Sequence, residues 1–165
     1  MVDTATPATL DRGDLPTVLV GVLLVNVVGA APALLAGPDS AWFQSLTAPA
    51  IYPPGWVFGV VWTGLFTLLG IAVALVWLAE SSRRRRVALG VFVAQMALNV
   101  AWTPAFFALE DLALGLVVIL ALWPLVVATL WAVARVDRRA AALVVPYLVW
   151  VSFAAVLNYR FLALN

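Results

Sequence analysis

The sequence predicts an all-α membrane protein, a five-transmembrane-helix bundle that forms a single domain over residues 1–165. Composition is the first reason, because 65% of the residues are hydrophobic and only 10% are charged, whereas about a quarter are charged in soluble domains. The second reason is five apolar runs that reach the roughly 20 residues a helix needs to cross a bilayer. The third is that the arginines gather between alternate runs.

The five runs contain no Asp, Glu, Lys or Arg except Arg160, near the end of the last one. They span Thr17–Ala36, Gly55–Ala79, Val87–Leu109, Leu112–Ala134 and Ala140–Leu162. We expect helices, because lipid cannot hydrogen-bond the backbone and a helix satisfies its own groups. Alternating strand patterns are absent from the sequence.

The first run has an alternative interpretation as a cleaved signal peptide, because small alanines stand at its end, where a cleavage site would lie. Two features favour a retained helix. The residues before the run are acidic, with Asp11 and Asp14 against Arg12, whereas a signal peptide begins with a positively charged region. The apolar run is also longer than that of a typical signal peptide.

The arginines predict the orientation of the bundle. With five spans, the N-terminus and the second and fourth connections lie on one side of the membrane. That side holds all but one of the 9 basic residues: Arg12, Arg83, Arg84, Arg85, Arg86, Arg135, Arg138 and Arg139. Because basic residues favour the inside, we expect the N-terminus inside and the C-terminus outside. We expect a multi-pass protein of a prokaryotic cell membrane.

Helical spacing gives the third run two specialised faces, since each residue advances by roughly 100°. One face carries amides and aromatic rings: Gln95, Asn99, Trp102 and Phe106. The other carries small residues, which permit close helix approach: Gly90, Ala94, Ala97 and Ala101. The first face suits a cavity or a polar contact between helices.

Similar stripes occur on the other runs. The second run carries Phe58, Trp62, Phe66, Leu69, Val73 and Trp77 on one stripe, and the fifth carries Pro146, Trp150, Ala154 and Leu157. The first run adds Asn26 and Ala30 one turn apart. These stripes could converge on one apolar, flat-walled pocket with a few hydrogen-bonding groups. The connection Gly37–Pro54 is long enough to act as a lid.

Structural interpretations of the same residues stay open. Tryptophans near helix ends often anchor a helix at the membrane interface: Trp42, Trp56, Trp77 and Trp131. Buried amides often join helices rather than contact ligands: Asn26, Gln95, Asn99 and Asn158. Proline inside a run predicts a kink: Pro104, Pro124 and Pro146. Gly55 and Gly59 form a lone GxxxG pattern, which is a weak dimer signal.

Missing residue types exclude several functions. The chain has no Cys and no His, which excludes axial haem ligation by those residues and a thiolate metal site. No Asp, Glu, His or Lys lies in an apolar run, so a proton relay lacks its parts. No internal repeat supports an inverted-repeat transporter. We therefore expect no metal, no required cofactor and no nucleic-acid partner.

Four motifs resemble the tryptophan-rich sensory protein family, the TspO/MBR family, which includes the translocator protein or peripheral-type benzodiazepine receptor. Tyr52–Thr63 (YPPGWVFGVVWT) resembles the start of its second helix, Gln95–Phe107 (QMALNVAWTPAFF) its third helix and Val145–Tyr159 (VPYLVWVSFAAVLNY) its fifth. Trp42–Pro49 (WFQSLTAP) resembles its first loop. The similarity runs in order over roughly residues 17–162.

The resemblance implies a five-helix bundle with a pocket in each monomer, lidded by the first loop. It implies a homodimer through the third helix, which agrees with the face of Gly90, Ala94, Ala97 and Ala101. It implies porphyrin ligands such as protoporphyrin IX or haem, and in some members sterols or synthetic isoquinoline carboxamides. By motif, the implied ligand-binding residues are Trp42, Phe43, Trp62, Asn99, Trp102, Trp150, Ala154 and Leu157.

Three positions depart from the family pattern. Phe43 stands where many relatives have Tyr, and Leu114 where animal members have a ligand-contacting Trp. Ala163 occupies the position at which the sterol-recognition pattern after Tyr159 needs a basic residue. Weak binding of drug-like ligands and of sterols is therefore expected.

The leading hypothesis for function is a membrane receptor or sensor for porphyrins or similar flat hydrophobic ligands, with membrane lipid and a second copy of the chain as partners. One alternative is light-dependent oxidative breakdown of a bound porphyrin, with Trp62 and Trp150 as electron donors. Another is transport of porphyrin or lipid.

Overall fold

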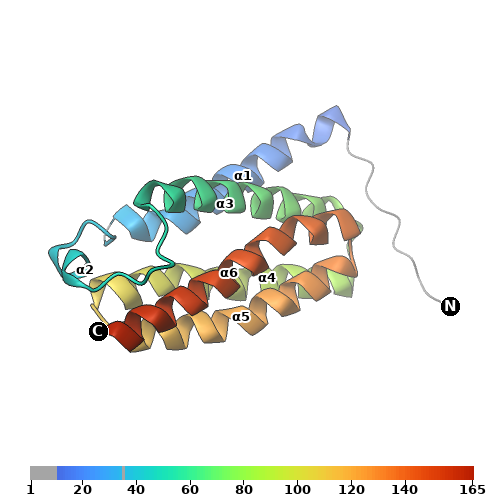
Figure 1. Cartoon of the computed structure of the whole chain (residues 1–165). Helices are drawn as coiled ribbons and strands as arrows, with labels where there is room; N and C mark the ends of the chain where they lie inside the picture. The colour runs from blue at the N-terminus through green and yellow to red at the C-terminus, as the bar shows by residue number, and fades with distance from the viewer. Residues whose placement is uncertain (1–10, 35) are drawn as a thin grey trace.

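Five long helices make up most of the computed structural model, which describes residues 11–34 and 36–165 (Figure 1). They are α1 (Leu15–Ala30), α3 (Gly55–Leu78), α4 (Arg83–Thr103), α5 (Leu112–Ala134) and α6 (Arg138–Leu164). Four short segments are η1 (Arg12–Asp14), η2 (Ala31–Leu34), α2 (Ala41–Ser45) and η3 (Pro104–Ala108). Together with the short segments that adjoin them, the long helices are long and apolar enough to cross a membrane. The predicted five-helix bundle is confirmed.

Three helices begin before the apolar runs that predict them, and the first, α1, begins at Leu15 rather than Thr17. α4 begins at Arg83 rather than Val87, because the Ser82 hydroxyl caps it by accepting a backbone hydrogen bond. α6 begins at Arg138, capped in the same way by the Asp137 carboxylate. Hydropathy detects only the part of a helix that can lie in lipid. Arginine is a good helix former, so a helix can include arginines outside that part. Both α4 and α6 therefore extend beyond the apolar core of the membrane.

Proline changes the helix type at two places. α1 passes into the 3-10 turn η2, which contains Pro32. α4 ends at Thr103, and the π-helical segment η3 begins at Pro104, because proline lacks the N–H that the α-helical ladder requires. α5 and α6 each continue as one helix through Pro124 and Pro146.

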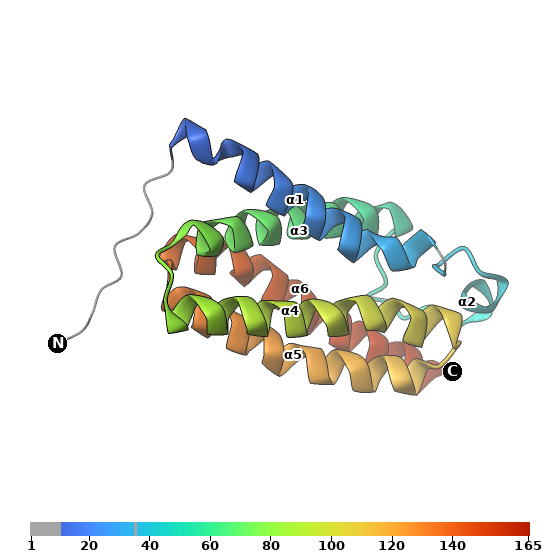
Figure 2. The same cartoon turned by 180° about the vertical axis from the view of Figure 1, so that it is seen from behind.

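Round the bundle, the long helices follow the order α1, α3, α6, α5, α4. α1 packs along α3, makes few contacts with α4, and leans away from the bundle toward its N-terminal end (Figures 1 and 2). Two glycines allow the backbones of α1 and α3 to approach closely. A Cβ atom added to Gly70 would lie 2.5 Å from the Cα atom of Val22, and one added to Gly21 would lie 2.7 Å from the Gly70 carbonyl oxygen.

Two apolar clusters hold the helices together. The larger one joins α3, α4, α5 and α6 and contains the fully buried Leu69, Val126 and Val151. The smaller one centres on Phe106, Leu157 and Phe161, and the segment that contains α2 packs against it. Lipid tails are themselves apolar, so these clusters stabilise the bundle mainly by close van der Waals packing.

Candidate functional site

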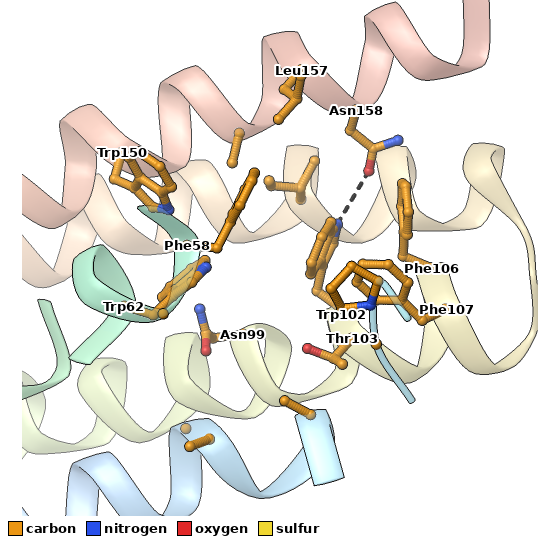
Figure 3. A pocket seen from close by; sticks show the side chains of 18 of the residues that line it. Phe58, Trp62, Asn99, Trp102, Thr103, Phe106, Phe107, Trp150, Leu157 and Asn158 are labelled. Atoms are coloured by element: carbon orange, nitrogen blue, oxygen red, sulfur yellow. Dashed lines mark hydrogen bonds between the residues drawn. The ribbon is translucent and has the colours of Figure 1, made fainter. Parts of the chain in front are cut away.

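A cavity of about 350 Å³ lies between α1, α3, α4 and α6, with Ile119 and Leu122 of α5 also in its lining (Figure 3). Residues 36–54, the connection that contains α2, also contribute to its lining and are called the lid below. The volume is near the lower end of the range of about 300–1,000 Å³ that is usual for small-molecule sites.

Aromatic rings from three helices form the walls and point toward one another (Figure 3). Trp62 of α3 and Trp150 of α6 meet almost at right angles, with ring centroids 6.4 Å apart. Phe58 packs edge-on against Trp150 at 5.8 Å. Trp102 of α4 stacks on Phe106 at 5.0 Å. Because each ring packs against another, the flat faces keep fixed orientations.

A chain of hydrogen bonds fixes Trp102 in this wall. Its indole Nε1 donates to Asn158 Oδ1 at 3.1 Å (Figure 3), and Asn158 Nδ2 donates to the Leu112 carbonyl oxygen at 3.0 Å. The contact joins α4 and α6 to the start of α5. Asn99 makes a second interhelix bond, because its Nδ2 donates to the Tyr147 hydroxyl at 2.9 Å. Both amides therefore join helices while also lining the cavity.

The indole N–H of Trp150 is buried and has no hydrogen-bond acceptor among the residues that the structure describes. Trp150 also lines the cavity, but its Nε1 atom is itself buried, so an acceptor group of a bound molecule would satisfy this donor once the surrounding rings shift. The amide of Gln95 is likewise buried and without a partner in the described part of the chain. Gln95 does not line the cavity.

The cavity is electrically neutral, since none of the described residues that line it is charged. At its lid, burial raises the pKa of the Tyr52 hydroxyl above its usual value, and the nearby Asp39 carboxylate raises it further. Tyr52 therefore stays protonated at neutral pH. The site offers flat apolar surfaces and a few neutral polar groups to a ligand.

Comparison with known proteins identifies the family to which this arrangement belongs. Residues 21–164 match the family model described as the TspO/MBR family. The chain belongs to the TspO/MBR family.

Relatives in the TspO/MBR family span bacteria and animals. The chain is 39% identical over 136 residues to a tryptophan-rich sensory protein of Cereibacter sphaeroides, covering 82% of this chain and 84% of the relative. It is 41% identical over 145 residues to the tryptophan-rich protein TspO of Chlorobaculum tepidum, covering 86% and 91%. It is 38% identical over 125 residues to the translocator protein of Homo sapiens, covering 74% of each.

Seven of the eight ligand-binding residues implied by the TspO/MBR motifs line the cavity: Phe43, Trp62, Asn99, Trp102, Trp150, Ala154 and Leu157. Trp42 does not line it. Trp42 lies behind the wall, with its ring edge-on to Phe106 at 5.9 Å. Contact of these residues with a ligand stays a prediction.

The remaining tryptophans lie on the outside of the TspO/MBR bundle. Trp56, Trp77 and Trp131 are 71%, 57% and 57% exposed. Arg85 lies over the Trp77 ring at 5.0 Å and Arg135 over the Trp131 ring at 3.4 Å, an arrangement suited to the membrane interface. Trp123, which the stripes did not include, donates to Ser152 Oγ at 2.8 Å.

The small-residue face of α4 is largely exposed, and a Cβ atom at Gly90 would meet no described atom within 4 Å. This surface is free in the monomer, and dimerisation through it stays a prediction. Gly55 and Gly59, expected only as a weak dimer signal, line the cavity instead.

Several lining residues were not expected from the sequence. Gly29 and Ala33 join Asn26 and Ala30 as the contribution of α1 and η2, and Phe161 closes the wall near the lid. The spacing of Asn26, Ala30 and Ala33 puts them on one helix face, so that face carried a usable signal. Gly29 is required there, because a Cβ atom would lie 2.5 Å from the Phe66 ring.

Proposed function

We propose that this protein is a membrane receptor or sensor that binds a porphyrin, or a similarly flat hydrophobic ligand, in the tryptophan-lined cavity. The observation that carries the proposal is that Trp62, Trp102 and Trp150, from three helices, line one cavity. Aromatic pairs gain about 0.5–1.5 kcal/mol beyond area burial, so a tetrapyrrole ring suits these walls. Relatives named as sensory and translocator proteins support a role in sensing or moving a small molecule.

The polar groups of the cavity narrow the chemistry of the ligand. The free N–H of Trp150 favours a ligand with a hydrogen-bond acceptor near its flat ring. The neutral lining disfavours burial of a carboxylate. Acidic side groups of a porphyrin would therefore stay at the mouth of the cavity, under the lid, while the ring enters.

The proposal extends to orientation and assembly. The protein would span a cell membrane with its N-terminus inside and form a homodimer through the exposed small-residue face of α4. The chain has no Cys, so single-cysteine variants report orientation directly. Ser81→Cys should react with an impermeant thiol reagent only in permeabilised cells, and Ala50→Cys in intact cells.

A titration of the protein in nanodiscs with protoporphyrin IX, in the dark, tests the function. Soret absorbance should show saturable binding at one site per chain, absent from empty nanodiscs. Trp150→Phe removes the free donor and keeps a ring, so affinity should fall about fivefold, the effect of one hydrogen bond of ordinary net strength. Trp131→Phe, outside the cavity, is the matched control. Uptake that never saturates and equals that of empty nanodiscs would contradict the proposal.

A further inference from the structure

The end of α6 lies beside the lid in both views of the molecule (Figures 1 and 2). There the side chain of Asn165 forms two hydrogen bonds with the backbone of Thr47. The Thr47 N–H donates to Asn165 Oδ1 at 2.8 Å, and Asn165 Nδ2 donates to the Thr47 carbonyl oxygen at 3.3 Å. One amide side chain thus pairs with both polar groups of a single backbone residue.

Asn165 is itself anchored to α6. Its Nδ2 also donates to the carbonyl oxygen of Phe161 at 2.9 Å, one helical turn earlier. The ring of Phe161 lines the cavity. Asn165 therefore links a fixed wall of the cavity to the middle of the lid.

Within residues 11–34 and 36–165, the two Asn165–Thr47 bonds are the hydrogen bonds that join the lid to a helix not adjoining it in sequence. The other contacts of the lid with α6 and η3 are apolar, and they include aromatic pairs and the side chain of Leu46. Phe43 packs against Phe107 at 5.1 Å and Phe161 at 5.3 Å, and Tyr52 packs against Phe161 at 5.5 Å.

These two kinds of contact restrain the lid differently. Aromatic pairs are stable over a range of offsets and tilts, so ring packing alone leaves room for small shifts of the lid. Hydrogen bonds require a defined distance and angle, so the paired bonds fix one position of Thr47. Phe43 precedes Thr47 and Tyr52 follows it in the chain, and both line the cavity. Fixing Thr47 therefore fixes both covering rings.

We propose that Asn165 is a positioning residue that latches the lid over the cavity and thereby sets how long a ligand stays bound. Opening breaks both bonds to Thr47 and separates Phe43 and Tyr52 from Phe161. The role in ligand residence rests on the proposed binding function, whereas the latch itself can be tested without ligand.

The ligand-free test is hydrogen exchange of residues 41–48 in nanodiscs. Asn165→Ala should speed exchange of the Phe43, Gln44 and Leu46 amides about 25-fold, the effect expected from two hydrogen bonds of ordinary net strength. These amides bond within the lid and not to Asn165, so faster exchange reports opening of the whole segment. Leu164→Ala, an exposed neighbour, should leave the rates unchanged. Equal rates in wild type and Asn165→Ala would overturn the latch.

The ligand test is the dissociation rate of protoporphyrin IX by stopped flow. Asn165→Ala should raise this rate about 25-fold without lowering the unfolding temperature of the bundle. Asn165→Asp keeps an acceptor for the Thr47 N–H but loses both donated bonds. Its dissociation rate should therefore lie between those of the wild type and Asn165→Ala. Asn165→Gln keeps the donor and the acceptor of the side-chain amide, so it should partly restore the slow dissociation of the wild type.

The two tests separate the two proposals. If no porphyrin binds to the wild type, the proposed function fails and the exchange result still decides the latch. If exchange speeds up in Asn165→Ala and the dissociation rate stays at the wild-type value, the lid opens without controlling the ligand, and the inferred role of Asn165 in ligand residence is wrong.

Discussion

Trp102 and Trp150 face the same cavity but use their indole N–H groups differently. The N–H of Trp102 is committed to Asn158, which also holds the start of α5. The N–H of Trp150 has no acceptor in the described structure. A buried donor without an acceptor costs stability, so the Trp102 bond contributes to the fold, and we propose that the Trp150 donor serves ligand recognition.

Asn158→Leu tests the structural role of the Trp102 bond. The substitution keeps similar volume but leaves the Trp102 N–H without its acceptor, so we expect a loss of about 1–3 kcal/mol in the free energy of unfolding. Ser152→Ala removes the corresponding acceptor from the outward Trp123 and should cost less than about 1 kcal/mol. Unfolding in mixed detergent micelles measures both. Equal losses would show that burial of the bond does not matter.

Asp137 gives the stability of the bundle a pH dependence. The hydrogen bond from the Arg139 guanidinium lowers the pKa of the Asp137 carboxyl, and backbone bonds from Arg139 and Ala140 add to this, against an opposing effect of burial. Because the folded pKa is depressed, the contribution to stability is present above the ordinary carboxyl pKa of about 3.9 and is lost as pH falls through the lower folded value.

Asp137→Ala should therefore lower the free energy of unfolding by about 1 kcal/mol at pH 7, the usual value of a helix cap. The difference from wild type should shrink when both proteins are unfolded near pH 3. Asp39→Ala, an exposed loop carboxylate, is the control. A difference that is the same at both pH values would show that the charge of Asp137 contributes nothing.

At the scale of helices, α1 depends on one neighbour. It packs on α3 through Gly21 and Gly70 and touches the rest of the bundle little. A side chain at Gly70 would meet the backbone of Val22, which cannot rotate away. The α1 wall of the cavity therefore depends on a glycine that does not itself line the cavity.

Gly70→Ala should push α1 off α3 and cost about 1–3 kcal/mol, the usual range for overpacking. Gly64→Ala, on the same helix, places its Cβ atom where no described atom lies within 4 Å and should leave stability almost unchanged. Comparing the unfolding of the two variants separates the cost of steric overlap with α1 from the effect of replacing any helical glycine with alanine. A neutral Gly70→Ala would contradict the packing described here.

The spans could be predicted because bilayer thickness sets both length and hydropathy. The starts of α4 at Arg83 and of α6 at Arg138 could not be predicted from hydropathy, because the capping residues Ser82 and Asp137 lie outside the apolar runs. The helical turn α2 lies in the connection Gly37–Pro54, for which the sequence predicts a lid but no helix, and its cap depends on the single hydroxyl of Ser40.

The residues that line the cavity also divide into those that the sequence predicts and those that it does not. Stripes on α3, α4 and α6 were visible because Trp and Asn stand out from an aliphatic background. α1 carries one polar residue, Asn26, on the face that lines the cavity, whereas Gly29 beside it carries little contrast with the apolar remainder of the helix. The bond between Thr47 and Asn165 depends on how two distant segments meet, which spacing along one helix does not reveal.

At the scale of the whole molecule, tryptophans separate into two groups by position. The exposed Trp56, Trp77 and Trp131 lie on the outer surface, two of them beneath arginine side chains. Trp62, Trp102 and Trp150 line the cavity. We propose interface anchoring for the first group and ligand binding for the second, although both have the same indole chemistry.

Equilibrium dialysis of protoporphyrin IX against two triple variants tests this division most directly, because it does not depend on the number of tryptophans in the protein. Replacing Trp62, Trp102 and Trp150 together with Phe should weaken binding about tenfold or more, since three aromatic contacts lose area and one free donor disappears. Replacing Trp56, Trp77 and Trp131 with Phe should leave affinity within about twofold of wild type. Equal affinities for both variants and the wild type would contradict the assignment of the cavity as the binding site.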